Sequence, residues 1–270
     1  MRRYSAHIGY LFSDRPLVER IAAARANGFD AVENPAPYAT PAPVIAAALK
    51  EAGLTYVQMG LPSGDAARGE KGLAALPERV AEFRATLEPS LDYAEAVGCR
   101  AMHAMAGVRP EGVPAAKLWD TYIGNLALAA DAARARGMLL LLEPIGSGTI
   151  ADYLLDTPDL ALRAIRELGR DNVRLIFDAF HTVNAGLDPL PFIRDHAGLI
   201  HHMHIADYPG RHEPGTGTLD FAALYAALDA AGYAGFIGCE YVPAGRTEDG
   251  LGWLAAHRAG AMRKAGAAHA

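Results

Sequence analysis

The sequence predicts an α/β protein, a single (β/α)8 TIM barrel that spans residues 1–270. Eight short apolar runs alternate with eight helical stretches, and this alternation requires a parallel sheet with right-handed crossovers. Eight units in 270 residues give about 34 residues per unit, the size of one βα repeat. No Ser/Gly linker divides the chain. An open doubly wound sheet is the alternative, but it favours a Gly-rich turn after the first strand, where this chain reads LFSDRP.

The predicted strands are short and mostly apolar, as expected for strands that are buried on both faces. They cover Ala6–Tyr10, Phe29–Glu33, Thr55–Met59, Arg100–Met105, Met138–Glu143, Val173–Asp178, Leu199–Ala206 and Gly235–Glu240. Between them lie the predicted helices, several of which begin at a proline and are followed by a glycine that suits a left-handed C-terminal residue. They cover Pro16–Ala26, Pro43–Ala52, Pro77–Val97, Ala115–Arg136, Pro158–Leu168, Pro189–His196, Phe221–Ala230 and Gly250–Lys264.

Composition and charge narrow the class of partner. The formal net charge of −6 argues against a nucleic-acid partner. No apolar run reaches the ~20 residues that cross a bilayer, so we expect no membrane partner, and the N-terminal apolar stretch is too short for a signal peptide. The chain has only two cysteines, too few for a disulfide framework. Proteins without disulfides are typical of the reducing cytoplasm, which is therefore the expected compartment. Barrels of this kind often pair through their helices, so a homo-oligomer is compatible with the sequence.

The functional residues are expected at the C-terminal ends of the strands, where barrels of this class place their chemistry. Glu143 ends the fifth predicted strand, Asp178 the sixth and Glu240 the eighth, while His204 lies in the seventh. The intervals from 143 to 178, to 204 and to 240 are 35, 26 and 36 residues, close to one βα unit each. Four consecutive strands therefore bring Glu, Asp, His and Glu to one rim of the barrel.

Three carboxylates that converge without a counter-charge repel one another, and a bound cation removes that repulsion. Carboxylate oxygens with one imidazole suit Mn²⁺, Mg²⁺ or Co²⁺ better than a thiolate-loving metal. We therefore expect one divalent metal ion at Glu143, Asp178, His204 and Glu240. Each residue alone would more often be a capping or ion-pair residue, and only their occurrence on successive strand ends favours a metal site.

Five further residues are candidates for the same site. His181 follows Asp178 by three residues, and either contacts substrate, supports a ligand or faces water. Arg211 lies in the loop after the seventh strand, where a guanidinium can bind a substrate carboxylate, or is a solvated loop residue. Glu33 either orients substrate or a water, or forms an ion pair at the barrel mouth. His103 either faces the pocket or is a core histidine, and strand alternation places His202 one layer below His204.

These residues and their surroundings resemble the xylose-isomerase-like TIM-barrel sugar isomerases and epimerases, and among them the hydroxypyruvate isomerases. The resemblance runs from HIGYLF to EDGLGW, and its most telling segments are GLPSGDAARGEKGLAALPERVAEFR, LLLLEPI, FDAFH, HHMHIADYPGRHEPGTG and IGCEY. It implies that Glu143, Asp178, His204 and Glu240 bind the metal. It further implies that Glu143 and Glu240 are the catalytic acid/base pair and that His181 and Arg211 contact substrate.

The implied reaction moves a proton between adjacent carbons of a small hydroxy-carbonyl acid or sugar through a metal-stabilised enediolate. Hydroxypyruvate, which would become tartronate semialdehyde, is the first expected substrate, and a four-carbon 2-oxo-tetronate is the second. One position departs from the pattern, because hydroxypyruvate isomerases have Gln where this chain has His204, and ketose 3-epimerases have His. If both glutamates act on one carbon from opposite faces, the outcome is epimerisation.

Three other functions compete with this interpretation. A DNA-repair endonuclease on the same barrel needs a trinuclear site with further histidines, but this chain has Met59 at one of those positions, and PGTGTLDF lacks the Asp-x-His motif. A dehydratase of cyclic polyols is a second alternative. A non-catalytic sugar-binding barrel would tolerate loss of Glu143 or Glu240, and the presence of both favours an enzyme.

Overall fold

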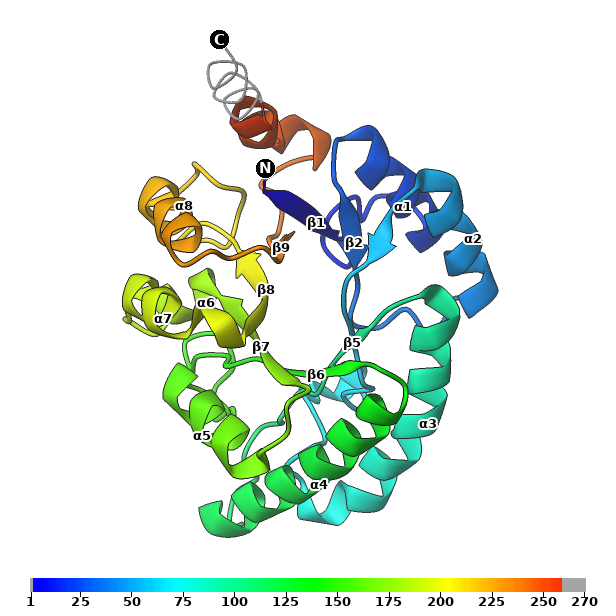
Figure 1. Ribbon diagram of the computed structural model, residues 1–270, viewed down its shortest axis with the longest axis vertical. Helices are drawn as coiled ribbons and strands as arrows, with labels where there is room; N and C mark the ends of the chain where they lie inside the picture. Colours follow the sequence, from blue (N-terminus) through cyan, green and yellow to red (C-terminus); the bar gives the residue numbers. More distant parts are fainter. Residues whose placement is uncertain (1, 259–270) are drawn as a thin grey trace.

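The computed structural model describes residues 2–258, in which nine parallel strand segments form a barrel surrounded by helices (Figure 1). The strands are β1 (Arg3–His7), β2 (Ala31–Glu33), β3 (Thr55–Tyr56), β4 (Met59–Gly60), β5 (Ala101–His103), β6 (Leu139–Leu142), β7 (Val173–Asp178), β8 (Ile200–Ile205) and β9 (Phe236–Cys239). Their order is β3-β2-β1-β9-β8-β7-β6-β5-β4. The predicted barrel is confirmed, and the open doubly wound alternative is excluded.

The third barrel strand is what closes the ring. Its first half, β3, pairs with β2, and its second half, β4, pairs with β5. Val57 and Gln58 separate the two halves, so one predicted strand becomes two short segments that pass from one neighbour to the other. Eight barrel positions are therefore filled by nine segments.

The predicted helices are all found among the described residues, with small shifts at their ends. They are α1 (Leu17–Ala26), α2 (Ala42–Ala52), α3 (Val80–Val97), α4 (Ala115–Ala135), α5 (Pro158–Leu168), α7 (Pro189–His196) and α8 (Phe221–Ala230). The last predicted helix begins at residue 252 and is helical to 258, and its predicted end at Lys264 lies outside the described residues. No described helix has the length and apolar character needed to cross a membrane.

One α-helix of the described residues was not predicted. α6 (Ala179–Asn184) begins directly after β7, where Asp178 caps it by accepting hydrogen bonds from the amides of Phe180 and His181 at 2.6 and 3.2 Å. Such N-terminal capping is a common use of aspartate. The same carboxylate therefore ends a strand, begins a helix and reaches the rim of the barrel.

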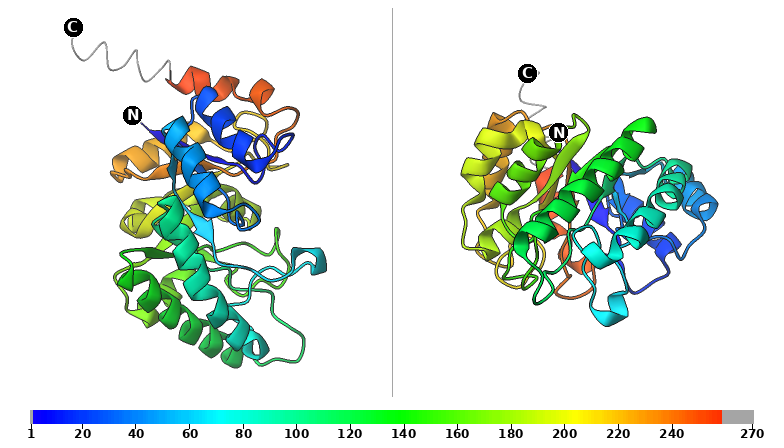
Figure 2. Two further views of the ribbon diagram at one scale, coloured as in Figure 1. Left: turned by 90° about the vertical axis from the view of Figure 1, so that its right-hand side faces the viewer. Right: turned by 90° about the horizontal axis from the view of Figure 1, so that it is seen from below.

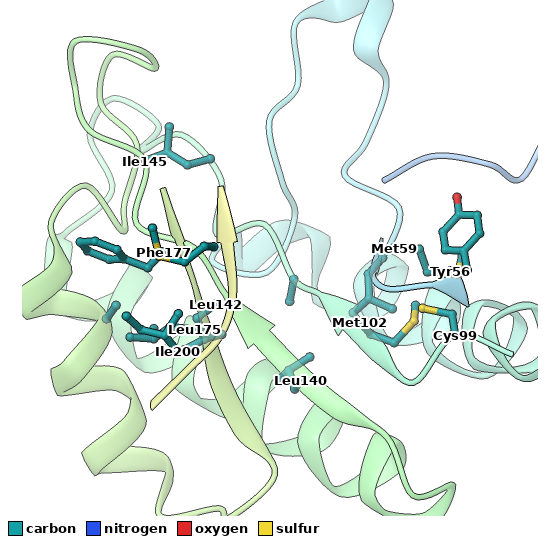
Figure 3. Close-up of a cluster of buried hydrophobic side chains, with 14 of the residues drawn as sticks. Tyr56, Met59, Cys99, Met102, Leu140, Leu142, Ile145, Leu175, Phe177 and Ile200 are labelled. Atoms are coloured by element: carbon teal, nitrogen blue, oxygen red, sulfur yellow. The ribbon is translucent and has the colours of Figure 1, made fainter. Parts of the chain in front are cut away.

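The core has two layers because side chains of a strand alternate between its faces. The large layer lies between strands and helices and includes Met102, Leu140, Leu142 and Phe177 (Figure 3). A small apolar cluster of Ala101, Leu141 and Ile176 belongs to the alternate positions of the same strands, inside the barrel. Directly above it, the inward positions become polar, and this change from apolar to polar marks the site.

The first strand is displaced from its predicted position. It runs over Arg3–His7 and not over Ala6–Tyr10, because the backbone of Arg3 pairs with Phe236 of β9. The Arg3 guanidinium lies over the Phe236 ring, 4.2 Å from its centroid, and donates to the carbonyl of Ala234, so a charged residue is accommodated at the strand start. As a consequence His7, not Tyr10, ends the strand and faces the rim.

Candidate metal and active site

The four predicted ligands meet at the C-terminal end of the barrel. Asp178 ends β7 and pairs in register with His204 of β8, while Glu143 and Glu240 each follow directly after their strands, β6 and β9. Each residue offers one ligand atom, and these atoms all lie within 4.8 Å of one another. All four side chains are largely buried. The structure thus brings together the residues that strand counting selected.

His204 is the centre of this group. Its Nδ1 lies 3.1 Å from Oε1 of Glu143 and 3.4 Å from Oε2 of Glu240, and its Nε2 lies 3.1 Å from Oε2 of Glu33. Burial acts to lower the pKa of His204, but the surrounding carboxylates, Glu240 and Glu33 first, raise it well above its ordinary value. In the metal-free protein these carboxylates therefore favour the protonated form of the imidazole.

Glu33 lies beneath His204 and does not line the cavity. Its side chain is fully buried, accepts a hydrogen bond of 2.9 Å from Nε2 of Gln58 and lies 2.7 Å from Nε2 of His202. Burial opposes its charge, but the two imidazoles, His202 first, hold the pKa of Glu33 well below its ordinary value. Glu33 is predicted to contact substrate, but the structure places it outside the cavity lining. Its contact with Nε2 of His204 instead suits a role in orienting that ring.

Arg211 and His181 close the other side of the site. Arg211 Nη2 donates to Oε2 of Glu240 at 2.5 Å and lies 3.9 Å from Oδ2 of Asp178. Nε2 of His181 lies 3.4 Å from the same Asp178 oxygen, and its Nδ1 lies 3.0 Å from the Thr149 hydroxyl. Both predicted substrate contacts line the cavity, and both also touch a predicted metal ligand.

Sequence reasoning missed one histidine and left a second undecided. Nε2 of His7 lies 3.4 Å from Oε1 of Glu240, and Nδ1 of His103 lies 3.8 Å from Oε2 of Glu143. Burial lowers the pKa of both imidazoles, against the opposing effect of the neighbouring carboxylates, and so favours their neutral form. His103 was identifiable as an inward position of a strand, but His7 was hidden by the misplaced first strand.

The cavity above these residues has a volume of about 410 Å³ and is lined by Glu143, His181, His204, Arg211 and Glu240, among others. A second cavity of about 490 Å³ opens at the opposite end of the barrel, where Arg3 and His201 line it. The larger cavity holds none of the four predicted ligands. We therefore place the chemistry in the smaller cavity, where the titratable groups converge.

The donor set fits a hard divalent cation. Oδ2 of Asp178 is buried and has no hydrogen-bond partner, although Oδ1 accepts two backbone amides. Burial raises the pKa of Asp178, with only partial compensation from His181. The basic groups nearest to this oxygen are His181 at 3.4 Å and Arg211 at 3.9 Å, and a buried carboxylate oxygen without a hydrogen bond is costly unless a cation meets it more closely. Three carboxylates and one imidazole within 4.8 Å supply the ligands that Mn²⁺, Mg²⁺ or Co²⁺ accept.

Comparison with known proteins gives one consistent family. The model of the xylose isomerase-like TIM barrel family matches residues 21–257. The chain is 41% identical over 255 residues to 2-oxo-tetronate isomerase of Cupriavidus necator, covering 94% of this chain and 98% of that protein. It is 33% identical over 258 residues to hydroxypyruvate isomerase of Escherichia coli, covering 96% of this chain and all of that protein.

Solved structures agree with this result. The crystal structure of AP endonuclease, family 2 from Brucella melitensis superposes with a TM-score of 0.91 at 37% identity, covering 94% of this chain and 98% of that chain. A structure of L-ribulose 3-epimerase superposes with a TM-score of 0.75 at 27% identity, covering 95% and 86%.

Proposed function

Because this chain is an isomerase of the xylose isomerase-like TIM-barrel family, we propose that it converts hydroxypyruvate to tartronate semialdehyde with one divalent metal ion. The observation that carries the proposal is the placement of two carboxylates, Glu143 and Glu240, within 3.4 Å of one imidazole nitrogen, Nδ1 of His204. Both line the cavity, and each has a buried histidine beside it, His103 next to Glu143 and His7 next to Glu240. Two such groups are what a proton transfer between adjacent carbons requires.

Glu143, Asp178, His204 and Glu240 would hold the metal ion. When bound, such an ion supplies Lewis acidity toward neighbouring oxygens of the substrate and lowers the cost of the enediolate charge. The unpartnered Oδ2 of Asp178 and the mutual distances of the four ligand atoms support this assignment. Neutral His204 would contribute Nδ1, because its Nε2 is directed at Glu33.

The two glutamates would divide the proton transfer between them. One takes a proton from C3 of hydroxypyruvate and the other returns a proton to C2, while the hydroxyl proton moves from O3 to O2, so atoms and charge balance. His103 lies 3.8 Å from Glu143 and His7 lies 3.4 Å from Glu240, so each glutamate has one buried imidazole next to it. Arg211 and His181 would contact the substrate oxygens on the Asp178 side of the cavity.

A four-carbon 2-oxo-tetronate is the second candidate substrate. Its support is the Cupriavidus necator relative, a 2-oxo-tetronate isomerase, which has the higher identity of the two relatives compared above. A ketose 3-epimerase reaction is a third candidate, supported by His204 and by the superposition on L-ribulose 3-epimerase. The Brucella structure shares the barrel, but Met59 is a buried apolar residue where a trinuclear nuclease site would need a histidine.

The test is a substrate panel on EDTA-stripped protein supplied with Mn²⁺ or Mg²⁺. Hydroxypyruvate, 2-oxo-tetronates and free ketohexoses are followed by NMR in D₂O. We expect metal-dependent turnover of hydroxypyruvate with deuterium at C2, and a fall in kcat of at least 1,000-fold in Glu143→Gln and Glu240→Gln. Faster turnover of the four-carbon acids would identify the second candidate, and exchange at C3 of ketohexoses the third. Turnover of none of them would contradict all three.

A further inference from the structure

The proposed substrates carry a carboxylate, and the site must compensate one more negative charge than a sugar would bring. Among the predicted metal ligands, Glu143, Asp178 and Glu240 contribute three negative charges, which a divalent ion and Arg211 would balance. A bound acid therefore adds one more negative charge beside the buried carboxylates of Glu143, Asp178 and Glu240, where an unpaired charge is costly. A further cation at the cavity wall would remove this cost.

Arg211 is poorly placed to supply that charge. Its guanidinium donates to Oε2 of Glu240 at 2.5 Å and lies 3.9 Å from Asp178, and these carboxylates, with burial opposing them, raise its pKa above the ordinary value. It is thus an ion-pair partner of two predicted metal ligands. Among the described residues that line the cavity, the one other permanent cation is Lys71.

Lys71 has no carboxylate partner of its own within residues 2–258. Its neighbour Glu70 also lines the cavity, but Glu70 accepts hydrogen bonds from Arg79 at 3.1 Å and from the amide of Asp65 at 2.8 Å. The Lys71 ammonium is therefore free to pair with a ligand. It lies in the segment between β4 and α3, which projects from the body of the molecule (Figure 2).

The backbone next to Lys71 is fixed to the barrel. Gly72 forms an antiparallel bridge with Ala106, and its amide donates to the carbonyl of Ser63 at 2.9 Å. Its φ is +122°, and a Cβ there would lie 2.5 Å from the carbonyl oxygen of Met105, so only glycine fits. This attachment holds the start of the exposed Lys71 side chain beside the cavity, whose lining includes the lysine.

We propose that Lys71 binds the carboxylate of the substrate and sets the preference of this enzyme for acids over neutral sugars. The assignment rests on the proposed function. The ammonium forms a charge-assisted hydrogen bond with the acid group, while the metal ligands and Arg211 act on the hydroxy-carbonyl end.

The test compares two small ligands on Mn²⁺-loaded protein by calorimetry. Glycerate carries the acid group and cannot isomerise, whereas dihydroxyacetone has a neutral hydroxymethyl group in place of the carboxylate of hydroxypyruvate. We expect Lys71→Met to weaken glycerate at least tenfold and to leave the Kd of dihydroxyacetone within about twofold. Lys71→Arg should retain most of the glycerate affinity. Arg68→Gln is the matched control, because Arg68 lies in the same segment, is 74% exposed and does not line the cavity.

Equal glycerate affinity in Lys71→Met and wild type would overturn the assignment. Equal loss of affinity for glycerate and dihydroxyacetone in Lys71→Met would indicate a collapsed segment and would also overturn the assignment. A wild-type protein that binds no glycerate would overturn it as well. Lysine-dependent glycerate binding without turnover of any acid would instead overturn the proposed function and leave the role of Lys71 intact.

Discussion

At the scale of single residues, the orientation of His204 decides what the site can do. An imidazole binds a metal through one neutral nitrogen, and the partner of the other nitrogen selects which one is free. Here Glu33 faces Nε2 at 3.1 Å, and Nδ1 faces Glu143 and Glu240. Gln58 and His202 hold Glu33 in turn, so a buried polar network below the site fixes the ligand above it.

This arrangement predicts that Glu33→Gln weakens the binding of Mn²⁺ by about 10- to 100-fold, the usual effect of losing a partner of a metal-bound histidine. The amide keeps the size of the side chain but provides a weaker acceptor for the Nε2 proton. Calorimetric titration of the EDTA-stripped protein measures the change. Glu248→Gln, which removes a carboxylate paired with Arg15 outside the cavity, should leave the affinity unchanged. Wild-type affinity in Glu33→Gln would show that His204 does not depend on Glu33.

Residue-scale prediction from sequence works where a residue's position in its strand is known. Glu143, Asp178 and Glu240 each end an apolar run, and His204 lies one βα unit from its neighbours, so counting strands was enough to select the four residues. Glu33 also ends an apolar run, but sequence does not say how deep a strand lies within the barrel. Gln58 lies at the break in the third strand, and no local pattern marks its contact with Glu33.

At the scale of elements, strand β9 has a glycine where the buried network of Glu33, His202 and His204 needs space. Gly238 of β9 pairs in register with His204, and a Cβ at Gly238 would lie 2.3 Å from Oε1 of Glu33 and 2.6 Å from Nε2 of His202. A strand glycine often marks such a close approach. β9 therefore carries glycine at an inward position because Glu33 and His202 occupy the space that its side chain would fill.

Gly238→Ala should therefore lower the free energy of unfolding by about 1–3 kcal/mol, as overpacking of a tight interior does, and should also weaken the binding of Mn²⁺. Denaturant unfolding and calorimetric titration measure the two effects. Gly124→Ala is the control, since Gly124 lies in α4 with no atom near its missing Cβ, and helix propensity there predicts a gain of up to about 1 kcal/mol. A neutral Gly238→Ala would mean that Glu33 and His202 shift freely.

Element boundaries show why sequence alone was incomplete. The apolar run around Ala6–Tyr10 was a sound strand signal, but pairing with β9 moved the strand to Arg3–His7, since cross-strand contacts and not local composition set register. α6 was not predicted because it is short and follows β7 without a loop. Its capping residue, Asp178, is also the end of that strand and a residue of the site. Both incorrectly predicted elements lie next to functional residues. At such positions the structure preferred by the local sequence differs most from the one that tertiary contacts require.

At the scale of the whole molecule, the site couples metal binding to stability. Three carboxylates and Glu33 surround His204, which holds its proton well above the ordinary pKa when no metal is present. Stability from that proton is fully present below about pH 6.5, the ordinary value, and is lost as the pH rises through the raised pKa. A metal ligand must be neutral, so bound Mn²⁺ and this proton compete for His204.

The metal-loaded protein should therefore unfold at a higher temperature than the EDTA-stripped protein, by an amount that grows with pH. At a free Mn²⁺ concentration of 100 times Kd the gain is about 2.7 kcal/mol, or about 5–10 °C for a chain of this size. Between pH 8 and pH 6 the difference should shrink, because the metal must displace the proton of His204 and the stabilisation that this proton gives the metal-free protein grows as the pH falls toward about 6.5. Scanning calorimetry at several pH values measures this difference. Asp178→Asn, which replaces a predicted ligand, should show little or no metal-dependent rise, and a pH-independent difference in the wild type would mean that His204 is not a ligand.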